Sequence, residues 1–255
     1  MKMDMSYRAT EYEDENARSE GQPVVVFACQ VLQDILERLL PEDLADCVVY
    51  QDYGLHRQPG KMTETLQEQI DRIEEASLVV LGYGLCGNGT SGLHSGKHIL
   101  LIPRVDDCIA LLLGSRRAYF REFEAEPATY YLSKGWLESG SHPLSEYHEY
   151  SEKYGAEDAQ WILDEQYQNY RRLALVAPTR EALDAYRPAA QEVAEFCRRW
   201  DMRYQEIIGS DDYVRRLVEA AAAIRMKGMG ARNEVPRDFL VVAPGEEVRQ
   251  DAFTL

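Results

Sequence analysis

The chain has 255 residues, which is enough for one large α/β domain or for two lobes with a hydrophobic core. Its content of 45% hydrophobic and 28% charged residues is ordinary for a folded soluble protein. The net charge of -16 argues against a nucleic-acid backbone or an anionic membrane as the main partner, although an anionic cofactor can still bind where the local charge differs from the total.

Residues 1–22 form a polar, acidic stretch that we expect to be disordered. This stretch lacks the apolar region of a signal peptide, and no apolar run in the chain approaches the roughly 20 residues that span a bilayer. We therefore expect a cytoplasmic protein that has no nucleic acid and no membrane among its partners.

Short apolar segments alternate with amphipathic segments from Pro23 onward. The first half is predicted to contain four strands, at 24–28, 47–51, 78–82 and 99–102. Helices are predicted between them, at 30–40 and 62–75, and another opens after Cys108. Such alternation is typical of a Rossmann-like α/β fold with a mostly parallel sheet and helices on both faces.

The alternation of strand and helix patterns breaks at 127–150, an aromatic stretch rich in turn residues. We interpret it as a strand or extended piece followed by a loop that faces the site. A helix at 145–170 follows, and the remaining pattern predicts three strands, at 173–177, 203–208 and 239–243, with helices at 181–200 and 211–225 between them.

The α/β domain is thus predicted to cover 23–225, as one sheet or as two lobes. In the second case the lobes are 23–125 and 170–250, and residues 126–169 join them. Residues 226–255 are predicted to supply a loop, the last strand and a tail.

Four residues that can bind soft or borderline metal ions follow predicted strands: Cys29, His56, Cys86 and Cys108. Because parallel strands finish along one edge of a sheet, where ligands bind, we expect these side chains to gather there. Three Cys and one His suit tetrahedral zinc and also an iron–sulfur cluster. The sequence therefore predicts a metal site, although an ordinary exposed loop histidine remains the alternative for His56.

The segment GYGLCGNGTSGL places five glycines directly after the third strand. Glycine permits positive φ and a close approach of the backbone to a ligand. We predict that Gly84, Gly87 and Asn88 contact a cofactor while the loop presents Cys86. A tight turn without a ligand is the alternative. The remaining cysteines, Cys47 and Cys197, lie in apolar or helical contexts and are interpreted as core residues.

The segment IPRVDDC places Arg104, Asp106, Asp107 and Cys108 just past the fourth strand. The two acids are candidates for binding a metal or for accepting a hydrogen bond from His56, and one of them is equally suited to cap the following helix. We expect the helix dipole to lower the pKa of Cys108. Arg104 suits a carboxylate or phosphate.

Lys134 and Trp136 flank Gly135 in the segment TYYLSKGW. We predict that they line the wall of a ligand pocket. Packing in the core is the alternative for the aromatic residues of this segment.

The motifs GYGLCGNG, PRVDDCIALLLGS and TYYLSKGW occur in this order, together with FAC in the first strand and an H-x-x-P from His56 to Pro59. This combination resembles the prokaryotic family catalogued as domain of unknown function 1638 (DUF1638), seen in anaerobic bacteria and methanogenic archaea, from about Val24 to about Val218. No activity comes with the resemblance. It implies a context of one-carbon metabolism, with a corrinoid cofactor, a corrinoid protein or a methyltransferase as partner.

Three functions follow as hypotheses, and the first is favoured. The protein binds a metal or metal cluster through Cys29, His56, Cys86 and Cys108, with zinc first among the metals. Alternatively, it is a metal-free enzyme or binding protein for a small anionic metabolite, with Arg104 and Lys134 as charge partners. In the third hypothesis it is a non-catalytic partner of a methyltransferase system. Because the three hypotheses differ in this respect, the sequence leaves open whether the protein is an enzyme.

Overall fold

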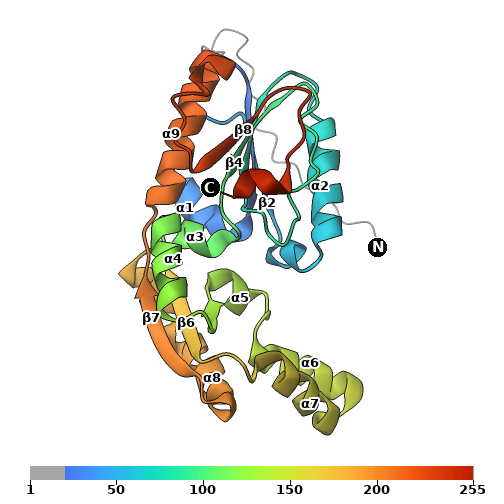
Figure 1. Cartoon of the computed structure of the whole chain (residues 1–255), viewed down its shortest axis with the longest axis vertical. Helices are drawn as coiled ribbons and strands as arrows, with labels where there is room; N and C mark the ends of the chain where they lie inside the picture. Colours follow the sequence, from blue (N-terminus) through green and yellow to red (C-terminus); the bar gives the residue numbers. More distant parts are fainter. Residues whose placement is uncertain (1–20, 255) are drawn as a thin grey trace.

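The computed structural model describes residues 21–254, apart from the side chains of His56 and Arg57. The expectation of disorder for residues 1–22 therefore falls almost entirely outside the described part. Two lobes, each built on its own sheet, lie one above the other in Figure 1. The α/β class with a mostly parallel sheet is confirmed, and of the two arrangements that the sequence left open, the strands form two sheets.

The first lobe contains a five-stranded sheet in the order β2-β1-β3-β4-β8. Its strands are β1 (Val24–Cys29), β2 (Cys47–Gln51), β3 (Leu78–Gly82), β4 (Ile99–Pro103) and β8 (Phe239–Val242). The first four are parallel, and β8 pairs antiparallel with β4. The apolar strand segments explain this arrangement, because β3 and β4 are buried along their whole length.

Helices cover both faces of this sheet. On one face lie η1 (Gln30–Leu32), α1 (Gln33–Leu39), α3 (Cys108–Leu112) and α9 (Asp212–Lys227), and on the other lies α2 (Pro59–Asp71) (Figure 1). Residues of β1 alternate accordingly: Val26 packs in the core beneath α9, whereas Phe27 packs with Met62 of α2. The short helix η2 (Tyr53–Arg57) precedes α2. The short helix η5 (Gln250–Phe253) packs through Phe253 in the same cluster as Phe27 and Met62.

The second lobe contains a parallel sheet in the order β5-β6-β7. Its strands are β5 (Thr129–Leu132), β6 (Arg172–Ala177) and β7 (Arg203–Ile208), and its helices are α5 (Lys134–Glu138), α6 (Pro143–Tyr154), α7 (Ala156–Tyr167) and α8 (Arg180–Cys197), followed by η3 (Arg198–Trp200). The helix α4 (Arg116–Ala125) leads from the first lobe into the second.

The lobes meet through close backbone contacts. The amide of Ser210, just after β7, donates to the carbonyl of Leu112 at 3.1 Å. A Cβ atom on the neighbouring Gly209 would lie only 1.9 Å from that carbonyl oxygen, so glycine permits the approach. Val176 of β6 belongs to the same hydrophobic core as the strands of the first lobe. The two sheets therefore share part of one core.

The predicted strands are confirmed, whereas three predictions about other segments need correction. Residues 127–150 contain β5 and then the helices α5 and α6, not a long loop. The single helix predicted at 145–170 is two helices, because Gly155 has φ 90°, which ends α6. The loop predicted from 226 begins later, since α9 extends to Lys227 and η4 (Gly228–Ala231) follows.

The strand at the end of the chain is placed by a long-range contact. The sequence grouped it with the strands after residue 170, but β8 joins the first sheet beside β4. Within the described residues, no helix is long and apolar enough to cross a membrane.

Candidate functional site

The strand order creates a reversal point between β1 and β3 at the carboxyl edge of the first sheet. From β1 the chain moves outward to β2, whereas from β3 it moves the other way to β4. Open α/β sheets bind ligands in the crevice outside such a reversal point. Cys29 ends β1, and Tyr83 directly follows β3. A Cβ on Gly82 would lie 2.6 Å from the Cβ of Ala28, so the ends of the two strands approach as closely as glycine allows.

Cys86 lies in the loop after β3 with φ 48°, in the left-handed region that a residue with a side chain seldom adopts. Two backbone hydrogen bonds hold this loop against the loop after β4. The amide of Leu85 donates to the carbonyl of Val105, and the amide of Cys86 donates to that of Asp106, both at 2.8 Å. Strain of this kind persists only where the surroundings enforce it, and it often marks a functional position.

The glycine-rich loop fits tightly at one point and is exposed at another. A Cβ on Gly84 would lie 2.6 Å from the carbonyl oxygen of Val105, so only glycine fits between the two loops. Gly87 and Asn88, with φ 64° and 74°, form the exposed tip of the loop. The loop therefore positions Cys86 by packing, and contact of Gly84, Gly87 and Asn88 with a cofactor stays a prediction.

Burial keeps the three strand-end thiols protonated. It raises the pKa of Cys29 to about 11 and that of Cys86 to about 12. It raises the pKa of Cys108 further, with added repulsion from Asp107 and from the two other thiols. Cys29 acts in this way on Cys86, and both act on Cys108, so the three thiols lie in one region of the fold.

The expected lowering of the Cys108 pKa is wrong. The helix α3, which begins at Cys108, has only five residues, so it has a weak dipole. The loss of solvent around the buried thiol outweighs that dipole, and a thiolate at Cys108 needs a counter-charge that the described residues do not supply.

Asp107 caps α3, as one of the alternatives for this pair of acids predicted. Its carboxylate accepts a hydrogen bond from the amide of Ile109 at 2.8 Å. Burial nevertheless raises the pKa of Asp107, and the nearby Asp106 adds to this effect. Asp106 is exposed, and its carbonyl supports the amide of Cys86.

Tyr83 is a member of the site that sequence reasoning missed. Its side chain is 3% exposed, and its hydroxyl has no hydrogen-bond partner within the described residues. Burial raises its pKa, and Cys29 and Cys86 both contribute repulsion, so the hydroxyl lies near these thiols. The only sequence signal was its place directly after a buried strand. An unsatisfied buried hydroxyl costs about 1–3 kcal/mol, which a ligand group could recover.

Other predicted residues lie away from the thiols or bridge the lobes. Arg104 donates to the carbonyls of Arg237 and Thr254, at 3.2 and 2.8 Å, and so holds the C-terminal segment. Lys134 lines a pocket between the lobes, where its ammonium lies 2.6 Å from Asp34. Trp136 is half-buried and packs against the cores of both lobes.

The predicted metal set is only partly described. The backbone of His56 lies in η2, after β2, while its side chain is outside the described part of the chain. Among the side chains that are described, no three His, Cys, Asp or Glu residues form a group that could hold a metal ion. The metal site with Cys29, His56, Cys86 and Cys108 therefore stays a prediction.

Comparison with known proteins identifies a family that the chain matches. The family model described as "Protein of unknown function (DUF1638)" matches residues 50–218, which is more than half of the chain. The matched region contains Cys86 and Cys108, while Cys29 precedes it. No curated protein and no solved structure matches the chain. The chain belongs to the DUF1638 family.

Proposed function

We propose that the protein binds a thiophilic metal ion through Cys29, Cys86 and Cys108. The observation that supports this proposal is that three thiols, which follow β1, β3 and β4 in the chain, influence one another near the carboxyl edge of the first sheet. The left-handed conformation of Cys86 supports it, because strain of this kind is often kept at functional positions. Zinc is the first candidate and an iron–sulfur cluster the second.

Metal binding at this site must displace protons. Burial keeps the thiols of Cys29 and Cys86 protonated up to pH about 11 and 12, whereas a metal binds the thiolate. The cation supplies the counter-charge that the buried thiols lack. We therefore expect protons to be released on binding and the affinity to fall as the pH is lowered.

The described side chains do not by themselves complete a metal site. The proposal accordingly requires the loops of Cys86 and Cys108 to draw the thiols together as the protons leave. The imidazole of His56 is the proposed fourth ligand, and the Tyr83 hydroxyl is a donor for a group bound beside the metal. With His56 bound, such a site would be closed, whereas a site of the three thiols alone would keep a fourth position open to activate a bound thiol or water.

The test is a zinc titration of reduced protein purified without oxygen, with metal content, visible spectrum and proton release as readouts. We expect one equivalent of metal. Cys86→Ser should weaken binding by more than the about 10- to 100-fold that loss of an outer-sphere partner costs. Cys47→Ser is the control, because Cys47 lies on β2 at the opposite end of the sheet from this site. Absence of stoichiometric metal, with unchanged binding in Cys86→Ser, would overturn the proposal.

The cellular setting is also a proposal. We place the protein in the cytoplasm of anaerobic bacteria or methanogenic archaea, in one-carbon metabolism. A corrinoid, a corrinoid protein or a methyltransferase is the proposed partner, and the net charge of -16 supports neither nucleic acid nor membrane. Co-purification from a native host tests this setting, and a protein that elutes with no such partner contradicts it.

A metal-free function as a binding protein or enzyme for a small anionic metabolite is the second candidate. A specific observation favours it: Lys134 and the buried Ser133 line a pocket between the lobes. Ligand-dependent thermal stabilisation that survives chelation of metals would support this candidate, and stabilisation that disappears with the metal would contradict it.

A further inference from the structure

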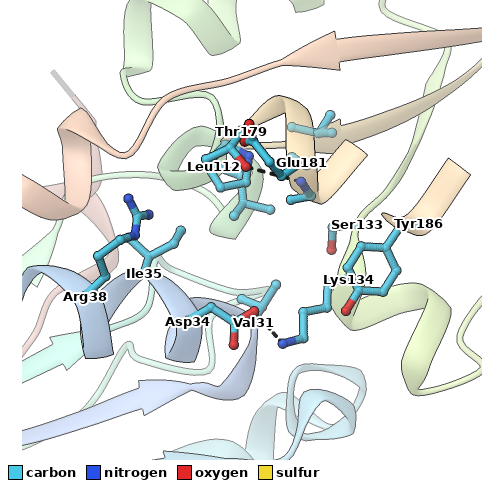
Figure 2. Close-up of a pocket in the computed structure, with 14 residues that line it drawn as sticks. Val31, Asp34, Ile35, Arg38, Leu112, Ser133, Lys134, Thr179, Glu181 and Tyr186 are labelled. Carbon is cyan, nitrogen blue, oxygen red and sulfur yellow. Dashed lines mark hydrogen bonds and ion pairs between the residues drawn. The ribbon is translucent and has the colours of Figure 1, made fainter. Parts of the chain in front are cut away.

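A cavity of about 380 Å³ lies between the lobes at the carboxyl ends of β5 and β6. Figure 2 shows Ser133, Lys134 and Tyr186 of the second lobe on one wall, facing Ile35 and Arg38 of α1. The volume suits a small ligand, and the carboxyl edge of a parallel sheet is where α/β proteins bind one. This pocket contains none of the three thiols, so it is a second site.

The floor of the pocket is apolar. Side chains from both lobes contribute: Val31, Ile35, Leu112, Val176, Ala177. Four of these five belong to the hydrophobic core that the two lobes share, and Ala177 belongs to the core of the second lobe. A ligand held here needs an apolar body that can replace water along this surface.

Ser133 supplies an unused polar group at the pocket. The residue is 1% exposed, and its hydroxyl has no hydrogen-bond partner in the described part of the chain. It occupies the N-cap position of α5 but makes no capping hydrogen bond. A buried hydroxyl of this kind is costly unless a partner arrives, and a bound ligand can be that partner.

Two further donors point to an anionic group. The 18-residue helix α8 begins at the pocket, where Thr179 caps the amide of Ala182, while the first-turn amide of Glu181 has no acceptor inside the helix. The Lys134 side chain is 25% exposed, and that of its partner Asp34 is 66% exposed, so solvent weakens their ion pair.

The acids of the pocket lie at its mouth. Asp34 and Glu181 are exposed, whereas Ser133 is buried and Lys134 is half-buried. Arg38 is exposed as well, so charged side chains of both signs lie outside and hydrogen-bond donors lie inside. A compact anion with an apolar tail matches this order, whereas inorganic phosphate has no apolar part to cover the floor.

We propose that this pocket binds a small organic carboxylate with an aliphatic body. The carboxylate accepts hydrogen bonds from the Ser133 hydroxyl and the first-turn amides of α8, and it competes with Asp34 for Lys134. The aliphatic body packs between Val31, Ile35 and Leu112. The site does not depend on the metal, since none of the residues that line it is a proposed metal ligand.

Hexanoate is the probe, and isothermal titration calorimetry of the full chain is the measurement. We expect saturable binding of hexanoate. Hexan-1-ol lacks the carboxylate and acetate lacks the long aliphatic body, so each should bind at least about tenfold more weakly. Ser133→Ala and Lys134→Met should each weaken hexanoate binding by roughly tenfold. Binding of hexan-1-ol as tight as that of hexanoate, or no saturable binding of hexanoate, would overturn the proposal.

Matched variants separate binding from folding. Ser139→Ala and Lys153→Met remove the same groups outside the pocket and should bind hexanoate like the parent. Ser133→Ala should also raise the unfolding temperature of the ligand-free protein, because it removes an unsatisfied buried hydroxyl. Cys86→Ser and chelation should leave hexanoate binding unchanged, so failure here and failure of the metal proposal are distinguishable. Unchanged affinity in both pocket variants contradicts the assignment.

Discussion

The backbone strain at Cys86 predicts how substitutions of this residue change the stability of the protein. With φ 48°, the residue adopts a conformation that costs a non-glycine residue about 1–2 kcal/mol. Cys86→Gly relieves this strain and loses some packing, so we expect a free energy of unfolding within about 1 kcal/mol of the parent. Cys86→Val, which is β-branched, should lose about 2 kcal/mol. Urea denaturation measures both, and a strongly destabilised Cys86→Gly would contradict this reading of the loop.

Asp107 makes stability depend on pH. Burial raises its pKa in the folded protein, so the folded state favours the protonated carboxyl. The stabilisation is present below the pKa of a free aspartate, about 3.9, and is lost as the pH rises through the folded value. Asn can also cap α3 but does not titrate. Asp107→Asn should therefore gain stability over the parent as the pH rises from acid to neutral.

The pH series is measured by urea denaturation of both proteins under matched conditions. Other carboxyl groups are the same in both chains, so their contributions cancel in the difference. A parent protein that gains stability relative to Asp107→Asn with rising pH would show that the hydrogen bond to the Ile109 amide outweighs burial.

At the level of single residues, the sequence predicted where a residue lies in the fold better than it predicted how buried that residue is. Cys29, Cys86 and Cys108 were placed on one edge because strand ends are visible in the pattern of apolar residues. The raised pKa of Cys108 was not predictable, because it depends on how completely other loops and the second lobe exclude water. Tyr83 was missed for the same reason, since the lack of a partner for its hydroxyl exists only in three dimensions.

The short helix α5 acts as a spacer between the lobes. Gly135 of α5 lies against the first lobe, where a Cβ would come within 2.9 Å of the Tyr53 ring and 3.2 Å of Val31. The Tyr53 ring is held in place, because its hydroxyl donates to Glu138 at 2.7 Å. Gly135→Ala should therefore destabilise the protein by about 1–3 kcal/mol through overpacking.

Gly60 in α2 provides the matched control for this change. A Cβ there has no neighbour within 4 Å, and its φ is not positive. Gly60→Ala should stabilise the protein by about 0.4–1 kcal/mol, because alanine restricts the unfolded chain. Thermal denaturation of the two variants tests the pair, and equal effects of the two substitutions would rule out α5 as a spacer.

At the level of elements, continuous apolar strands were predictable and their partners were not. Val24–Cys29 and Leu78–Gly82 are buried on both faces, which leaves a strong local pattern. The place of β8 is set by pairing with β4 across a large sequence separation, which no local pattern encodes. The break at Gly155 was hidden, because polar residues surround it on both sides.

The two lobes should unfold together. The Ser210 amide bonds the Leu112 carbonyl across the interface, and Val176 packs within the core of the first lobe. Separating the lobes would expose this core, so neither lobe keeps its stability alone. All three tryptophans, Trp136, Trp161 and Trp200, lie in the second lobe, whereas helices occur in both. Tryptophan fluorescence and far-ultraviolet circular dichroism therefore report different parts of the molecule.

We expect both signals to change in one urea transition with the same midpoint. Gly209→Ala is the informative variant, because its Cβ would lie 1.9 Å from the Leu112 carbonyl oxygen and must push the lobes apart. That variant should be less stable, and its fluorescence and circular dichroism transitions should no longer have the same midpoint. If fluorescence changes before circular dichroism in the parent protein, the shared core does not couple the lobes. The pocket that they form would then open and close independently of folding, and hexanoate binding should raise the fluorescence midpoint alone.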